Sequence, residues 1–161
     1  MKRKNEMSKF KSVTTVGPVF WAKVMPGQEE MGYLGAYEAF DGAFTIDQEL
    51  SKEEFAKLKE AGSQKRPVQK HLMDGRIVLK FVRKNRVTNG KGELVEAASG
   101  APELVDADGN PWYGEFIGNG SVCVLTNLLS FFKAPDGTTG CRTTLTKVQV
   151  LEHIAFESEA A

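Results

Sequence analysis

Runs in which apolar and polar residues alternate, separated by turns rich in glycine, recur along this chain. Successive side chains of a β-strand point to opposite faces, so a period of two predicts a strand. Strands are predicted over residues 18–25, 43–50, 76–86, 121–132 and 141–154. The last two enclose the turn Pro135-Asp136-Gly137 and should form a hairpin. Five or six strands with little helix favour a small β-barrel over a doubly wound α/β sheet.

A single helix is predicted, over Lys52–Ala61. Ser51 stands at the N-cap position, and Glu54 three residues later completes a capping box, in which each side chain bonds the other residue's amide. Phe55 and Leu58 share one face of this helix, and Gly62 provides the stop. The expected fold class is therefore mostly β with one short α-helix.

The length of 161 residues fits one domain. Residues 1–12 show no periodicity and are expected to form a flexible basic arm, residues 13–155 the folded domain, and residues 156–161 a short acidic tail. Cys123 and Cys141 lie in apolar, strand-like runs and are interpreted as small hydrophobic residues with free thiols. The N-terminus leads into no apolar stretch, so no signal peptide is expected, and no run is long enough to span a membrane.

The formal net charge is zero, from 21 basic and 21 acidic residues. The charges are nevertheless segregated along the chain. Residues 1–24 carry six Lys or Arg and one acid, residues 64–91 carry nine and one, and residues 93–115 carry six acids and no base. Such segregation predicts a basic face on the folded molecule, although charge runs are also common on ordinary solvated surface.

Residues that would carry a reaction are few. His71 and His153 lie far apart, and neither they nor the two cysteines show the spacing of a zinc site. Asp106, Asp108 and Asn110 imitate the start of a calcium-binding loop, but the glycine is displaced and the glutamate is missing, so an Asx turn is the simpler interpretation. We expect a protein that is not an enzyme and that uses no metal or other cofactor.

Aromatic residues interleaved with lysine and arginine are the pattern with the clearest chemical use. Binding a single nucleic-acid strand without reading its sequence requires aromatic faces for the bases and cations for the phosphates. Trp21 and Lys23 share one face of a predicted strand, where side chains two residues apart are spaced by about 7 Å, close to the spacing of successive phosphates. The candidate contact residues are Trp21, Lys23, Tyr33, Tyr37, Lys80, Arg83, Lys84, Arg86, Trp112, Tyr113, Phe132 and Arg142.

The alternation along residues 76–86 predicts a different role for each face of this strand. Lys80 and Lys84 should face the nucleic acid, while Phe81 and Arg83 face the interior. A register one residue off would exchange the faces and make Arg83 the phosphate contact. The aromatic candidates also have an alternative interpretation, in which Trp21 and the other aromatic residues pack in the interior and do not stack on bases.

Several segments together resemble the single-stranded DNA-binding proteins of tailed bacteriophages. They are the strand and helix over 44–62, the alternating stretch 78–84, Val105-Asp106-Ala107 followed by Ile117-Gly118-Asn119-Gly120-Ser121, and the ending 145–151. The resemblance covers roughly residues 18–155. It implies a single OB-type β-barrel of five or six strands that binds single-stranded DNA along its concave strands. It also implies a role in phage DNA replication, recombination and repair, in the host cytoplasm.

The same resemblance implies partners besides DNA. Members of the family often form homodimers and recruit replication proteins, such as polymerase and helicase-primase, through a long acidic C-terminus that ends in an aromatic residue. Here only Glu152, Glu157 and Glu159 follow the last strand, and Phe156 is not terminal. Either a longer tail has been removed or recruitment works differently. The alternative function is an OB-like protein-interaction module, whose basic strand faces would be scattered and not joined in one groove.

Overall fold

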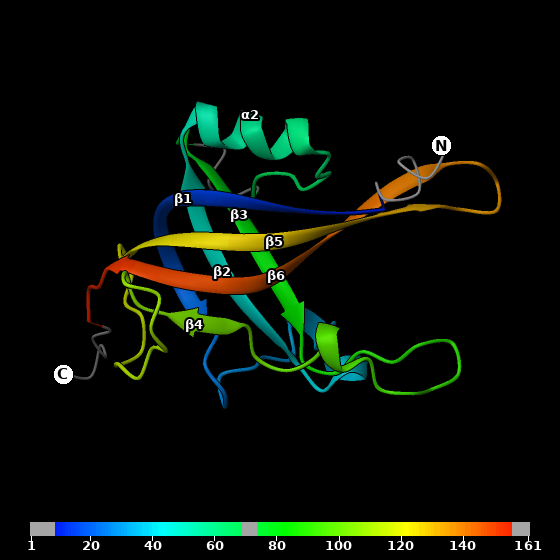
Figure 1. The fold of residues 1–161 in the computed structure, drawn as a ribbon, viewed down its shortest axis with the longest axis horizontal. Coiled ribbons are helices and arrows are strands. Elements are labelled where there is room, and N and C mark those ends of the chain that lie inside the picture. The colour runs from blue at the N-terminus through cyan, green and yellow to red at the C-terminus, as the bar shows by residue number, and fades with distance from the viewer. Residues whose placement is uncertain (1–8, 69–73, 156–161) are drawn as a thin grey trace.

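The computed structural model describes residues 9–68 and 74–155, and within them a single six-stranded sheet in the order β3-β2-β1-β5-β6-β4 (Figure 1). The predicted acidic tail and residues 1–8 of the predicted basic arm lie outside the described residues. The strands are β1 (Phe10–Lys23), β2 (Ala43–Leu50), β3 (Ile77–Lys84), β4 (Glu103–Val105), β5 (Val122–Lys133) and β6 (Thr139–Glu152). The helix α2 (Lys52–Ala61) and the short 3-10 turns η2 (Tyr33–Gly35), η3 (Glu38–Phe40) and η4 (Glu96–Ala98) complete the described elements.

The predicted mostly-β fold with one α-helix is confirmed, and it is of the OB type. The helix α2 and the strand β2 begin and end at the predicted residues. Ser51 Oγ accepts from the Glu54 amide at 3.1 Å, and Gly62 ends the helix in the left-handed conformation. The second half of the predicted capping box was wrong, because the Glu54 carboxylate accepts instead from the Val16 amide at 2.9 Å and ties α2 to β1. No helix among the described residues is long and apolar enough to cross a membrane.

Strand β1 is longer than predicted and joins the two halves of the sheet. It begins at Phe10, so residues 10–12, expected in the flexible arm, belong to the strand. Its first half pairs with β5 and its second half with β2, and Figure 1 shows the bend between them. At the bend a Cβ on Gly17 would lie 2.1 Å from the Glu49 carbonyl oxygen, so only glycine fits there.

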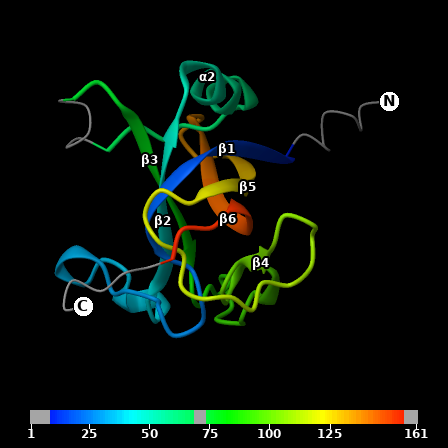
Figure 2. The same ribbon diagram turned by 90° about the vertical axis from the view of Figure 1, so that its left-hand side faces the viewer.

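The core lies between the sheet and α2, which covers one end of it (Figure 2). Its largest fully buried side chains include Phe44, Phe81 and Leu58. One buried polar residue crosses this core: Gln48 on β2 donates its side-chain amide to the Cys123 carbonyl at 3.0 Å and to two carbonyls of β1. Because buried polar groups are costly unless bonded, this amide fixes β2 against both β1 and β5.

The sheet does not close into a complete barrel. Among the described residues no strand pairing joins β3 to β6, whose edges form an open seam. Arg83 on β3 crosses the seam from the inside, donating to the Leu145 carbonyl of β6 at 3.3 Å. Its other donors go to the carbonyls of Ala97, Ser99 and Gly100, at 2.8–2.9 Å. Arg83 is only 7% exposed, so its inclusion among the candidate DNA contacts was wrong.

Candidate nucleic-acid interface

A cavity of about 770 Å³, called here the seam cavity, occupies the opening between β3 and β6. Lys84 and Val82 reach it from β3, because the odd-numbered residues of that strand point into the core. Arg142 reaches it from the part of β6 that precedes the pairing with β4. The cavity is lined by Phe40, Gln64, Lys65, Val82, Lys84, Val87, Thr88, Ala98, Ser130, Cys141, Arg142, Thr143 and Thr144.

The ends of β5 and β6 extend beyond the rest of the fold as a hairpin, called here the hairpin arm (Figure 1). A second cavity, the arm cavity, lies beside this hairpin arm. It measures about 1050 Å³ and separates this hairpin arm from the end of α2. The start of β1 enters it because Phe10 pairs with Ser130 of β5. Its lining residues are Lys9, Phe10, Lys11, Ala61, Gly62, Gln64, Phe131, Phe132, Lys133, Thr139, Gly140 and Cys141.

The loop after α2 joins these cavities to a third, of about 870 Å³, which is called here the helix cavity. Gln64 lines all three, and Lys65 lines both the seam cavity and the helix cavity. The loop is fixed to β6, since Ser63 Oγ lies 2.8 Å from Thr143 Oγ1 and the Cys141 amide donates to Gln64 Oε1 at 3.3 Å. The three cavities are therefore neighbours around this loop, and together they are called here the groove.

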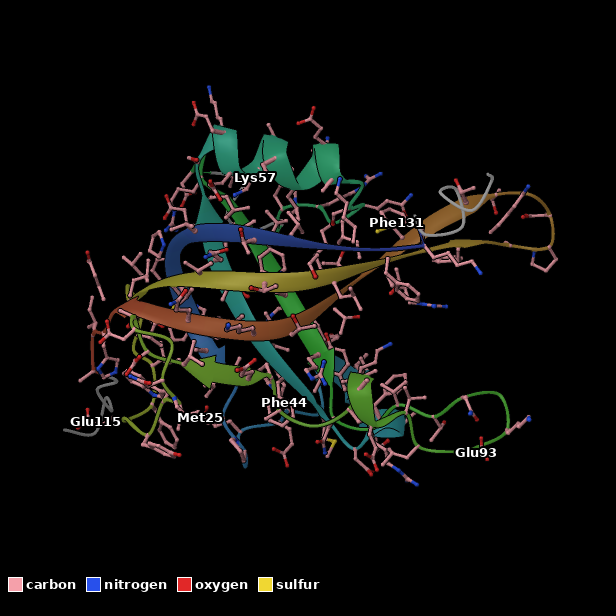
Figure 3. All side chains as sticks on the ribbon, in the orientation of Figure 1. Met25, Phe44, Lys57, Glu93, Glu115 and Phe131 are labelled. Atoms are coloured by element: carbon pink, nitrogen blue, oxygen red, sulfur yellow. The ribbon has the colours of Figure 1, made fainter. Side chains whose placement is uncertain are left out.

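Two glycines hold phenylalanine rings in the groove. A Cβ on Gly62 would lie 2.6 Å from the Phe131 ring, and one on Gly140 would lie 2.3 Å from the Phe132 ring. The rings therefore occupy the space that a side chain at either position would take. Figure 3 shows Phe131 at the base of the arm, beside the end of α2. Rings packed on backbone in this way are set in position before any ligand binds.

The charged side chains that line the groove, among the described residues, are all basic. They come from six segments of the chain and are Lys9, Lys11, Lys59, Lys65, Arg66, Lys84, Lys133 and Arg142. No aspartate or glutamate is among the described residues that line the three cavities. The Lys84 ammonium lies 4.2 Å from the centroid of the Phe40 ring, and the Arg142 guanidinium 4.7 Å from that of Phe132. The groove thus presents cations and aromatic rings side by side.

Three of the predicted contact residues meet in the groove: Lys84, Phe132 and Arg142. The predicted register of β3 is confirmed, because Phe81 is buried while Lys80 and Lys84 are on the other face. Lys80 lines none of the three cavities, and its ammonium lies 3.3 Å from the Asp47 carboxylate.

Five more predicted contact residues line none of the three cavities, namely Trp21, Lys23, Tyr33, Tyr37 and Arg86. Lys23 lies 3.9 Å from Glu30, and Arg86 3.9 Å from Asp41. Trp21 sits at a β-bulge with a positive φ of 52°, where its amide donates to Asn119 Oδ1 at 2.7 Å. Its side chain is 57% exposed, so the alternative that Trp21 packs in the core is wrong. Tyr33 and Tyr37 lie in the irregular segment between β1 and β2.

Trp112 and Tyr113 belong to the same loop as Glu115. Figure 3 shows Glu115 on the side of the molecule opposite the β5–β6 hairpin arm. Trp112 packs against the core, donates its indole N–H to the Glu115 carbonyl at 3.2 Å, and meets the His153 ring edge-on at 4.9 Å. Tyr113 is almost fully exposed. Stacking by Trp112 would require it to leave these contacts.

Most of the residues lining the groove were not predicted from the sequence. They include Lys9, Phe10, Lys11, Phe40, Lys65, Phe131 and Lys133. The sequence feature that could have indicated the lysines was the charge distribution, since three of them lie in the two basic segments 1–24 and 64–91. A clue to Phe131 was its position four residues before the hairpin turn, beside a predicted contact residue.

The fold is shared with solved proteins of the phage single-stranded DNA-binding class. One is gp2.5, a single-stranded DNA-binding protein encoded by bacteriophage T7, with a TM-score of 0.57 and 15% sequence identity over 92% of this chain and 90% of that chain. Another is the single-stranded DNA-binding protein from bacteriophage Enc34, with a TM-score of 0.52 and 10% identity over 96% of this chain and 87% of that one. At such identities the likeness establishes a common fold. The sequence matches no protein-family model and no curated protein sequence.

Proposed function

We propose that this protein binds single-stranded DNA without sequence preference, along the groove formed by the seam, arm and helix cavities. The observation that carries the proposal is the lining of that groove, in which phenylalanine rings and eight cations occur without a carboxylate among the described residues. Cations bind the phosphates, and exposed ring faces stack on bases of any identity, with about 1–3 kcal/mol per stacked base.

The groove favours a single strand over a duplex for a physical reason. In a duplex the base faces are stacked on one another, so rings such as Phe10 and Phe132 would gain nothing from contact with it. The likeness in fold to phage single-stranded DNA-binding proteins supports the same function. The gathering of eight cations around three neighbouring cavities argues against the alternative of a protein-interaction module, which predicts scattered basic faces.

The finer roles follow as parts of this proposal. The protein protects and organises single-stranded DNA during phage replication, recombination and repair in the host cytoplasm, and it acts as a binding protein and not as an enzyme. Recruitment of replication proteins and formation of a homodimer are proposed from the family resemblance alone.

Fluorescence anisotropy with labelled oligonucleotides of equal length tests the proposal. We expect oligo-dT and a mixed-sequence strand to bind similarly, and duplex DNA at least about tenfold more weakly. Affinity should fall as salt rises, with a log–log slope near −0.7 for each phosphate neutralised. A single-stranded RNA of matching sequence measures any preference for the sugar. Equal affinity for duplex and single strand would contradict the proposal.

A further inference from the structure

Lys65 lies where two of the three cavities of the groove adjoin. It lines both the seam cavity and the helix cavity, and the neighbouring Gln64 lines these and the arm cavity as well. We propose that Lys65 binds a backbone phosphate at this junction and so anchors the strand where the three cavities meet. The inference rests on the proposed function and assigns to one residue a role that the sequence did not predict.

The backbone around Lys65 is held in place before any ligand arrives. Its amide donates to Ser63 Oγ at 3.3 Å, and that hydroxyl lies 2.8 Å from Thr143 Oγ1 on β6. The Ser63 amide in turn donates to the Leu58 carbonyl of α2 at 3.3 Å. The loop is therefore attached to both the helix and the sheet, which lowers the entropy lost when the ammonium fixes an anion.

Lys65 has no ion-pair partner among the described residues. Its side chain is half-buried, and within the described parts of the chain no carboxylate lies within ion-pair distance of its ammonium. The charged groups that face this region from the packed elements are Lys59 of α2, Asp47 of β2, Lys80 and Lys84 of β3, Arg66 of the loop and Arg142 of β6. Asp47, the one acid of this set, lies 3.3 Å from Lys80.

These surroundings lower the pKa of Lys65 below the ordinary value of 10.5, first through burial and then through repulsion by Lys80, with Asp47 acting in the opposite direction. A bound phosphate would favour the charged ammonium and raise the pKa again. Binding is then tightest below the pKa of the free protein and weakens as pH rises through it, because the neutral amine attracts the phosphate poorly. Lys84 and Arg142 differ from Lys65 in their contacts, since each of these cations already lies over an aromatic ring.

Lys65→Gln tests the anchor directly, with Lys52→Gln as the matched control. Lys52 is exposed in the first turn of α2 and lines none of the three cavities. At low salt we expect Lys65→Gln to weaken oligo-dA binding by roughly tenfold and to reduce the salt slope by about 0.7, with the melting temperature unchanged. Lys52→Gln should leave both nearly as in the wild type. Equal effects of the two substitutions would overturn the assignment.

A pH series separates a phosphate contact from a merely structural role. Oligo-dA is the probe because its bases do not ionise between about pH 7 and 10.5. All variants carry Cys141→Ser, because the Cys141 thiol lines the groove and is itself titratable. Lys65→Arg, whose guanidinium stays charged, should bind with less pH dependence than Lys65 itself. Identical pH profiles would overturn the inference while leaving the proposed function intact. Failure of the wild type to bind any strand would instead refute the proposed function.

Discussion

The guanidinium of Arg142 lies 4.7 Å from the centroid of the Phe132 ring, and the ring itself packs on the backbone at Gly140. Phe132 and Gly140 are directly paired in the β5–β6 ladder, and Arg142 stands two residues further along the same face of β6. One short stretch of the arm therefore presents a ring for a base next to a cation for a phosphate. This pair accounts for two of the three predicted contact residues that the groove contains.

Phe132→Ala tests stacking in the groove. The ring is partly exposed and outside the core, so its removal should weaken oligo-dT binding by about 1–3 kcal/mol and leave the melting temperature nearly unchanged. Tyr113→Ala is the matched control, because Tyr113 is an exposed aromatic that lines none of the groove cavities. If Tyr113→Ala weakens binding and Phe132→Ala does not, the DNA binds near Tyr113 and not in the groove.

The cations of the groove should determine the salt dependence. Lys84→Gln combined with Arg142→Gln removes two charges that line the seam cavity, and the salt slope should shrink by about 1.4, taking roughly 0.7 for each phosphate. The control pair is Lys23→Gln with Arg86→Gln, since both of those residues face carboxylates and line none of the three cavities. Anisotropy titrations at several salt concentrations give both slopes. Equal reductions in the two double variants would show that DNA contacts are spread over the surface.

The sequence predicted those elements whose signals are local. The N-cap of Ser51, the apolar spacing of Phe55 and Leu58, and the stop at Gly62 all act within about three turns of chain, so α2 was predicted to the residue. The beginning of β1 at Phe10 was missed because the stretch 10–16 is largely polar and its pairing partner lies more than a hundred residues away. A strand made by a distant partner leaves little trace in its own sequence.

The groove was harder to predict than the fold for the same reason. Its lining comes from Phe40, Ala98 and residues near 9–11, 55–67, 82–88 and 130–144, which only the fold brings together. Alternation placed Lys84 on the correct face of β3. It placed Trp21 beside Lys23, but the bulge in β1 breaks the register between them, and neither residue lines the seam cavity.

Arg83 should act on stability and not on DNA binding. Arg83→Met keeps much of the side-chain volume but leaves the Ala97, Ser99, Gly100 and Leu145 carbonyls without their donor. We expect the free energy of unfolding in urea to fall by about 2–4 kcal/mol. The salt slope of the folded variant should match the wild type. A variant of normal stability with a reduced slope would restore Arg83 as a phosphate contact.

Cys141 offers a built-in reporter of groove occupancy. Its thiol is half-buried and lines both the seam cavity and the arm cavity. Burial raises the pKa of Cys141 above its ordinary value, with a hydrogen bond from Thr143 acting in the opposite direction. Cys123 is fully buried, and burial raises its pKa to about 12, so it should stay unreactive in the folded protein.

The rate at which iodoacetamide alkylates Cys141, measured by mass spectrometry near pH 9, tests the central claim most directly. The reagent is neutral, so added DNA does not repel it. If the groove holds the strand, saturating oligo-dT should slow the reaction several-fold, while the same concentration of duplex should leave it nearly unchanged. An unaltered Cys141 rate in oligo-dT, with saturation confirmed by anisotropy, would show that the protein binds single-stranded DNA somewhere other than this groove.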